Sequence, residues 1–143
     1  MAHPIRSRWD NQFVDRPESS KLHSKIRELI LKNPIMKSLK CYQEVPVVDL
    51  CPDYYSNAHR FDWYCEELNL VIEVHGQQHY TLTNRGNIGR GQAEREFAKS
   101  RMRDSEKKQA ALEAGYNYLE ISYKDVKKLT HEGLQNLLFE SSL

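Results

Sequence analysis

Two stretches of β-strand composition carry side chains that can bind a metal ion or transfer a proton: Asp62 in the first, Glu73 and His75 in the second. Residues 60–65 are rich in aromatic side chains and residues 70–74 are strongly apolar, with a polar stretch between them, so the segment predicts a β-hairpin. Because side chains alternate across a strand, Glu73 and His75 point to the same face. Pairing of the two strands then brings Asp62 towards the same edge.

The two carboxylates predict a metal site. Aspartate is disfavoured in strands and Glu73 interrupts an apolar run, although an exposed edge residue and the polar face of a half-exposed strand are the structural alternatives. Two carboxylates in a partly buried place are unfavourable unless a cation or protons neutralise them. Oxygen ligands of this kind suit Mg²⁺ or Mn²⁺. We therefore expect Asp62 and Glu73 to hold one of these cations.

His75 and His79 are candidates for proton transfer, because the pKa of an imidazole lies near neutral pH. His75 can accept a proton from the attacking water, orient a phosphate, or be a structural histidine. His79 follows Gly76, which lets the backbone turn, and it can protonate the leaving group or hold the scissile phosphate. The same spacing is that of a zinc-binding histidine pair, but no third soft ligand is evident nearby in the sequence.

The hairpin and the residues that follow resemble a known group of nucleases. Asp62, ten intervening residues and then Glu73-Val74-His75 is similar to the PD-(D/E)xK signature with histidine in the place of lysine, and the continuation to His79 resembles the very-short-patch-repair (Vsr) and EDxHD homing endonucleases. The resemblance implies an α/β restriction-endonuclease-like core, a central mixed β-sheet flanked by helices. It also implies that the backbone carbonyl of Val74 completes the metal shell.

The flanks of the hairpin match the group less closely. Arg103-Asp104 and residues 112–121 are similar to its acid-bearing helix, glycine turn and last core strand, although Asp104 on a charged helix can simply pair with Lys108. On the first helix, His23 stands where the EDxHD proteins would have a glutamate. Either His23 substitutes in proton handling, or a nearby glutamate (Glu18 or Glu28) serves, or the activity is altered.

Helices and strands around the hairpin follow from hydrophobic spacing and capping residues. Ser19 or Ser20 predicts the start of a helix that ends at Asn33-Pro34, and residues 41–50 give short β-like runs around Pro46. A long charged helix is expected over 93–114, with Phe97, Asp104 and Ala111 on one stripe and Gly115 as its cap. A strand over 118–122 and a helix capped by Thr130, burying Leu134, Leu137 and Leu138, complete an α-β-β-β-α-β-α order.

Length and composition predict one domain, 1–143, with residues 1–18 as an extended N-terminal arm. No apolar run approaches the roughly 20 residues that span a bilayer, and the start has no apolar signal-peptide core, so no membrane association and a cytoplasmic protein of a bacterial or phage-infected cell are expected. The three cysteines form no CxxC pair, which indicates neither a disulfide framework nor the structural zinc that the Vsr resemblance implies.

Charge is divided along the chain although the net charge is only +1. Residues 46–79 carry one basic and six acidic groups, and basic segments flank them on both sides. A metal nuclease needs cations for the phosphate backbone beside carboxylates for the metal, although scattered Lys and Arg can also be a solvated surface. The candidate DNA-binding residues are Arg85 and Arg90 in a glycine-containing loop, Arg95, Lys99, Arg101 and Arg103 on the helix, and Arg6 and Arg8, with Trp9, in an arm that either enters a groove or is solvated.

These observations predict a Mg²⁺-dependent DNA endonuclease, of the homing or nicking (Vsr-like) kind, acting on double-stranded DNA as a monomer or homodimer. Metal at Asp62 and Glu73 would polarise the phosphate, while His75 accepts a proton and His79 assists the leaving oxygen. The alternatives are a nuclease-fold module that binds nucleic acid without cleaving it, suggested by His23, and an RNA-processing nuclease.

Overall fold

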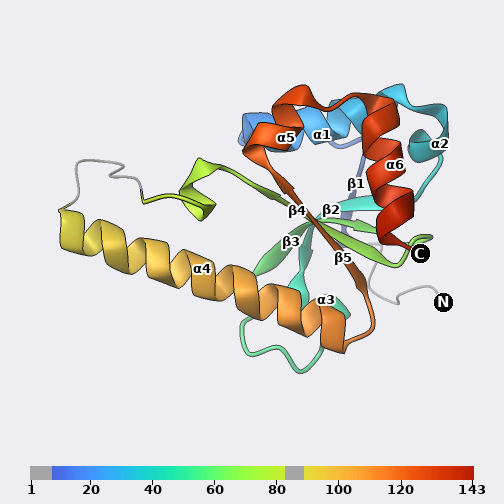
Figure 1. The fold of residues 1–143 in the computed structure, drawn as a ribbon. Coiled ribbons are helices and arrows are strands. Elements are labelled where there is room, and N and C mark those ends of the chain that lie inside the picture. The colour runs from blue at the N-terminus through green and yellow to red at the C-terminus, as the bar shows by residue number, and fades with distance from the viewer. Residues whose placement is uncertain (1–7, 83–88) are drawn as a thin grey trace.

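The computed structural model describes residues 8–82 and 89–143, which form an α/β fold with helices on both faces of one mixed sheet (Figure 1). The sheet has the order β1-β2-β3-β4-β5, in which β4 and β5 are parallel and the other neighbours are antiparallel. Its strands are β1 (Asp10–Asn11), β2 (Cys41–Pro46), β3 (Arg60–Cys65), β4 (Leu70–His75) and β5 (Asn117–Ser122). The helices are α1 (Lys21–Lys32), α2 (Pro34–Lys37), α3 (Val47–Leu50), the 3₁₀ turn η2 (Gln77–His79), α4 (Arg90–Glu113), α5 (Tyr123–Lys128) and α6 (His131–Ser141).

The predicted hairpin is confirmed, and so is its strand parity. Trp63 pairs with Ile72 and Cys65 with Leu70, and Asn69 adopts a positive φ of 49° in the turn. Leu70 and Ile72 belong to the core beneath α1 and α6, whereas Val71 belongs to the core on the α4 side. Glu73 and His75 therefore face α4.

The helices on the first face begin where the sequence predicts. The hydroxyl of Ser20 accepts the backbone N–H of His23 and caps α1, and the hydroxyl of Thr130 accepts the N–H of Gly133 and caps α6. Asn33 ends α1 and caps α2. These helices bury Ile26, Ile30, Leu134 and Leu138 against the sheet, but Leu137 is only half-buried, against the expectation.

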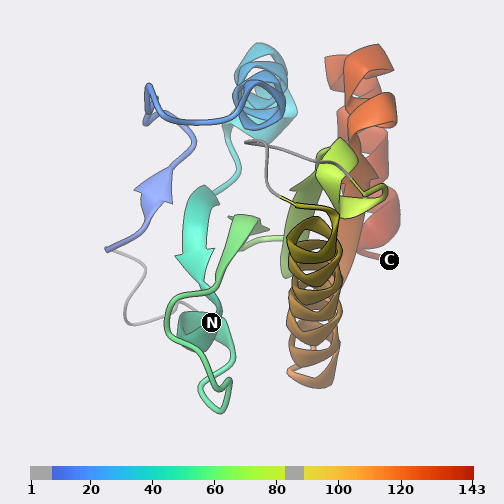
Figure 2. The ribbon, with the colours of Figure 1, turned by 90° about the vertical axis from the view of Figure 1, so that its left-hand side faces the viewer.

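Helix α4 lies across the other face and projects beyond the sheet (Figure 1). Figure 2 looks along the axis of α4 and shows the end of this helix beside the strands. Only Ala93, Lys107 and Ala111 of α4 are buried, so its amino-terminal half is largely solvent-exposed. Gly115, with a φ of +91°, ends the helix in the left-handed conformation that favours glycine, as predicted.

The described part of the amino-terminal segment is not a free arm. Asp10 and Asn11 form β1 and pair with β2, and Trp9 is only 8 % exposed. The Trp9 indole N–H donates to Asp49 at 2.9 Å, and its ring packs edge-on against Tyr42 and Tyr64. Insertion of Trp9 into a DNA groove is therefore the wrong interpretation, because burial of the indole in the core stabilises the fold more than exposure does.

Further short elements also depart from the sequence prediction. Residues 47–50 form helix α3 instead of a β-like run: Pro46 is the last residue of β2, paired with Arg60, and a helical turn starts directly after it. Helices α2 and α5 were not expected, since four- and six-residue helices carry too little periodicity to be seen in the sequence.

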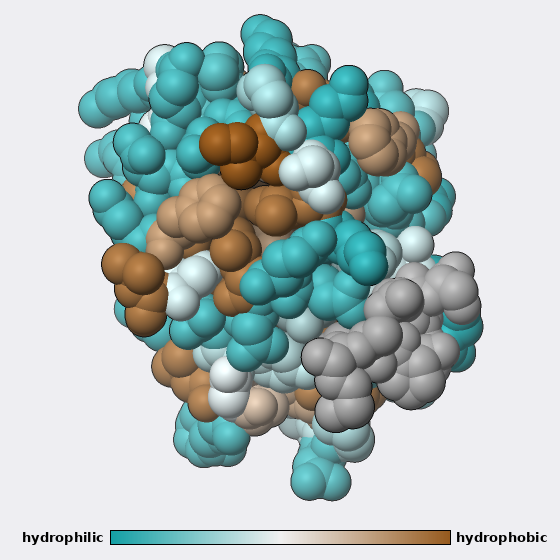
Figure 3. Space-filling view, turned by 90° about the vertical axis from the view of Figure 1, so that its right-hand side faces the viewer, coloured by the Kyte–Doolittle hydropathy of each residue, from teal (hydrophilic) through white to brown (hydrophobic). Residues whose placement is uncertain are grey.

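The surface opposite the projecting end of α4 is largely hydrophilic, with hydrophobic residues gathered near its middle (Figure 3). Within residues 8–82 and 89–143, the helices lack the combination of length and apolar character that spanning a lipid bilayer requires.

Candidate active site

Strand pairing is interrupted on both sides of Asp62. On one side the β2–β3 register runs through Gln43↔Trp63 and Val45↔Phe61 and omits the position between them, where Glu44 has a positive φ of 51°. On the other side the β3–β4 register stops at Trp63↔Ile72. Asp62 therefore lies at a gap in the pairing with β2 and just beyond the end of the pairing with β4.

Two carboxylates replace the missing backbone pairs between β3 and β4. The backbone N–H of Asp62 donates to Glu73 Oε2 at 2.9 Å, and the N–H of Val74 donates to Asp62 Oδ2 at 2.8 Å. One backbone N–H of each strand thus donates a hydrogen bond to a carboxylate of the other strand. This reciprocal arrangement fixes the two carboxyl groups beside each other, as the sequence predicted, and it satisfies backbone donors that the splayed strands leave unpaired.

One row across the sheet is acidic on four successive strands. Continuing the register places Glu44 opposite Asp62 and Asp62 opposite Glu73, and the Cα partner of Glu73 in β5 is Glu120. Burial and the charge of Asp62 both raise the pKa of Glu44, and the same two causes raise the pKa of Glu73 well above its ordinary value. The row therefore concentrates negative charge that a cation can relieve.

Lys107 of α4 is the functional candidate that the sequence analysis missed. Its ammonium group forms an ion pair with Glu73 Oε1, an atom that has no other polar partner among the described residues, and both side chains are buried. A signal was available, because Lys107 lies three residues after Asp104 and four before Ala111, next to the stripe that these two residues form. The lysine of the PD-(D/E)xK signature was compared with His75, on the strand, and no lysine on the helix was considered.

His75 and His79 lie together against Asp104. Their rings are stacked, with centroids 4.2 Å apart and an interplanar angle of 5°. His79 Nδ1 is 2.7 Å from Asp104 Oδ2, and His75 Nε2 is 3.8 Å from Asp104 Oδ1. Asp104 thus pairs with these two imidazoles, and the pairing with Lys108 that was considered from the sequence is wrong: the Lys108 ammonium lies over the Tyr118 ring instead.

The pKa values of His75 and Asp104 are shifted in directions that suit proton transfer. Burial lowers the pKa of His75, with His79 acting in the same direction and Asp104 and Glu120 opposing it. Burial also acts to raise the pKa of Asp104, but the hydrogen bond with His79 and the nearby cationic groups outweigh it, so the pKa of Asp104 is lowered. His75 is therefore mainly neutral and Asp104 ionised at pH 7.

His23 reaches the opposite side of Asp62. It stacks on Trp63 with ring centroids 4.9 Å apart, and its Nε2 lies 3.0 Å from Gln43 Oε1. Donor atoms of His23, Glu44 and Asp62 all lie within 4.8 Å of one another. The glutamate beside His23 is thus Glu44, from β2.

Neither glutamate that the sequence suggested as a substitute joins this group. Glu18 is exposed and lies 3.8 Å from Arg16, and Glu28 is exposed on α1. Glu44 was missed because only its place opposite Asp62 in the sheet, together with its positive φ, turns its carboxyl group towards His23.

Two cavities meet at Asp62. The smaller, of about 320 Å³, is lined by Glu73, both histidines of the stacked pair, Asp104 and Lys107. The larger, of about 870 Å³, extends from His23 towards the arginines Arg8 and Arg16. Glu44, Arg60, Asp62 and Val74 line both cavities, so two acidic residues of the row, Glu44 and Asp62, border both.

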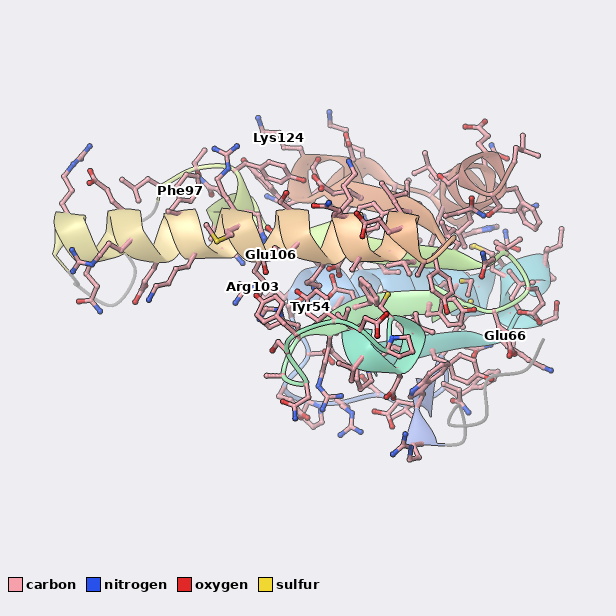
Figure 4. The ribbon with its side chains drawn as sticks, turned by 90° about the horizontal axis from the view of Figure 1, so that it is seen from below. Tyr54, Glu66, Phe97, Arg103, Glu106 and Lys124 are labelled. Atoms are coloured by element: carbon pink, nitrogen blue, oxygen red, sulfur yellow. The ribbon has the colours of Figure 1, made fainter. Side chains whose placement is uncertain are left out.

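The predicted cationic residues are distributed unevenly about these cavities. Arg103 lines the smaller one, on the side of α4 that faces Tyr54 (Figure 4), and Arg8 lines the larger one with a side chain 66 % exposed. Arg90, Arg95, Lys99 and Arg101 are exposed on the projecting half of α4. The predictions for Arg6 and Arg85 lie outside the described residues.

The donor chemistry of the acidic row fits a hard divalent cation. Asp62 and Glu44 offer oxygen donors that share a cavity, and burial, followed by the charge of Asp62, raises the pKa of Glu44. In the present arrangement Glu73 is engaged by the Asp62 amide and by Lys107. The sequence-derived set of Asp62, Glu73 and the Val74 carbonyl remains a prediction, to which Glu44 is added as a carboxylate with a free approach.

No protein-family model, curated protein or solved structure matches the chain.

Proposed function

We propose that this protein is a metal-dependent DNA endonuclease with a PD-(D/E)xK restriction-endonuclease-like core. The observation that carries the proposal is the position of Asp62, between Glu44 and Glu73 at an interruption of both strand pairings and beside the stacked histidines. Carboxylates and imidazoles around an open cavity are the groups that phosphodiester hydrolysis requires.

Mg²⁺ or Mn²⁺ would be held by Asp62 with Glu44 or Glu73, and when bound it would supply charge stabilisation for the phosphate and a more acidic water. The remaining work falls to this chain's own residues. Lys107 holds the Glu73 carboxylate in place, and through it the backbone of Asp62. Arg60 and Arg103 line the smaller cavity, beside Glu73, and can neutralise substrate phosphates.

The histidine pair has two distinct roles in this proposal. With its proton on Nδ1, which faces Glu120 Oε1 at 3.4 Å, neutral His75 keeps the Nε2 lone pair free to accept the proton of the attacking water. Asp104 accepts from His79 Nδ1, which orients the ring and leaves Nε2 as the proton donor to the departing 3′ oxygen. Water thus adds to phosphorus, the P–O bond breaks, and one proton is taken up by His75 while another leaves His79.

A second candidate is a nuclease-fold module that binds nucleic acid without cleaving it. The Glu73–Lys107 ion pair favours it, because the most deeply buried carboxylate of the row already has a cation from the protein. In this case the exposed basic residues of α4 would bind phosphates and the acidic row would be structural.

The two candidates separate on a plasmid cleavage assay. Supercoiled, relaxed and single-stranded DNA, with RNA as a further substrate, are incubated with Mg²⁺ or Mn²⁺ and either wild type or Asp62→Asn, which retains the acceptor for the Val74 amide. Asp53→Asn, on an exposed loop outside the acidic row, is the matched control. We expect metal-dependent nicking or linearisation, reduced by about 100-fold or more in Asp62→Asn only.

Binding measured in EDTA completes the design. Retained DNA binding by Asp62→Asn with lost cleavage supports the endonuclease. If wild type cleaves none of these substrates but binds DNA, the binding module is the correct reading; cleavage of RNA alone would replace DNA as the substrate. Equal cleavage by wild type and Asp62→Asn would overturn the proposed site.

A further inference from the structure

A third metal ligand stands next to the two histidines. From the sequence, His75 and His79 have the spacing of a zinc-binding pair but no third ligand near them. The fold brings Asp104 of α4 to both of them, and one donor atom from each of the three side chains lies within 4.8 Å of the others. This group is separate from the cluster of His23, Glu44 and Asp62.

The distances between the donor atoms suit a small tetrahedral ion. Ligand atoms at zinc-like bond lengths lie about 3.4 Å from one another in a tetrahedral site. The separation of His79 Nδ1 from Asp104 Oδ2 is 2.7 Å, and that of His75 Nε2 from Asp104 Oδ1 is 3.8 Å. The two separations involve different oxygens of Asp104, and one donor atom of each residue lies within 4.8 Å of the others. Binding of an ion therefore requires the donors to approach by about 1 Å and the stacked rings to tilt until their lone pairs point to one centre.

The surroundings orient His75 as metal sites usually do. Its Nδ1 faces Glu120 Oε1 at 3.4 Å, which leaves Nε2 for the ion, and Glu120 in turn accepts the Tyr80 hydroxyl at 2.6 Å. A carboxylate behind a ligating histidine fixes its tautomer and raises its basicity. The His75 side chain is also only 5 % exposed, so its ring is held in place by packing.

We propose that His75, His79 and Asp104 bind one zinc-class divalent ion, with the fourth position left to water. Two imidazole nitrogens and one carboxylate oxygen are the ligand set of open zinc sites, whereas Mg²⁺ prefers oxygen ligands only. The ion would occupy the lone pairs that the proposed hydrolysis uses, so Zn²⁺ would inhibit Mg²⁺-dependent cleavage; this consequence alone rests on the proposed function.

The site is tested by binding of the metal alone, independent of any cleavage. Untagged, reduced protein is titrated with Zn²⁺ by calorimetry and with Co²⁺ by visible absorption, in wild type, His79→Asn and the matched control His131→Asn, a histidine that lines neither cavity. His23→Asn is titrated as well, because His23 belongs to the other cluster. We expect one ion per chain and the intense visible bands of low-coordinate Co²⁺. Affinity should fall by at least about 100-fold in His79→Asn and stay within about threefold in His131→Asn. The three cysteines are buried and offer no competing surface site.

A second variant keeps the test decisive if His79→Asn unfolds. Glu120→Gln leaves all three ligands in place and should weaken Zn²⁺ binding by about 10- to 100-fold, through the orientation of His75. Thermal unfolding with and without Zn²⁺ reports on the same event, because an ion that binds only the folded chain raises its Tm. Absence of Zn²⁺ binding by folded wild type, or its loss in His23→Asn and not in His79→Asn, would overturn the site whether or not the protein is a nuclease.

Discussion

The ammonium group of Lys107 lies against the carboxylate of Glu73, and each residue is less than a tenth exposed. The same carboxylate accepts the backbone N–H of Asp62 through its other oxygen. Helix α4 is thereby connected to the point where β3 and β4 separate. A substitution at Lys107 therefore alters the Glu73 carboxylate that holds the backbone of Asp62. It does so without requiring a contact between the side chains of Lys107 and Asp62.

Replacing Lys107 by methionine should destabilise the protein strongly. The substitution preserves most of the buried hydrocarbon but removes the cation that faces Glu73. At a pH above the folded pKa of Glu73, where its carboxylate is ionised, such a change typically costs about 3–5 kcal/mol. Urea denaturation followed by circular dichroism measures the loss. Lys99→Met, on the exposed half of α4, is the matched control and should change stability by no more than about 0.5 kcal/mol.

The double variant Lys107→Met/Glu73→Gln identifies the cause of that loss. Removing both charges should recover part of the stability of the single variant, because no buried carboxylate then lacks a partner. An equal or larger loss in the double variant would mean that Lys107 acts through packing alone.

The stability contributed by Glu73 should decrease as pH rises. Burial and the charge of Asp62 raise the pKa of Glu73 in the folded protein above the value of about 4.3 expected when unfolded. The folded state therefore holds this proton more tightly, so the favourable contribution is complete below about pH 4.3 and is lost as pH rises through the folded pKa.

The measurement compares the free energy of unfolding of wild type and Glu73→Gln between pH 4 and pH 8, in EDTA. The free energy of unfolding of wild type minus that of Glu73→Gln should decrease with increasing pH and become constant above the folded pKa of Glu73. An increase of this difference with pH would show that the ion pair with Lys107 outweighs the effect of burial on the pKa of Glu73.

Truncating Trp9 should show that the amino-terminal segment is part of the fold. The indole is buried among aromatic rings and donates to Asp49, so Trp9→Ala should cost about 3–5 kcal/mol. Phe13→Ala, four residues away and 55 % exposed, should change stability by less than about 0.5 kcal/mol. Chemical denaturation measures both, and similar small effects of the two variants would restore the interpretation of a free arm.

Elements that depend on local pattern could be predicted from the sequence. An aromatic run and an apolar run around a polar stretch gave the hairpin, and side-chain alternation gave the common face of Glu73 and His75. Ser20, Gly115 and Thr130 marked helix ends that the structure confirms. Capping and alternation are decided by residues within a few positions of each other, so they can be read along the chain. The nuclease resemblance adds an activity to these elements, and that activity remains a prediction.

The identity of the distant side chains that share the site depends on tertiary packing. Glu44 joins Asp62 through sheet register and a positive φ, Lys107 joins Glu73 through the rotation of α4 on the sheet, and Asp104 completes a group with His75 and His79 by the same rotation. Register and helix rotation are set by the packing of the whole core, and no local preference of these residues encodes them. For this reason the sequence identified the chemistry of the hairpin, while the fold selected its partners.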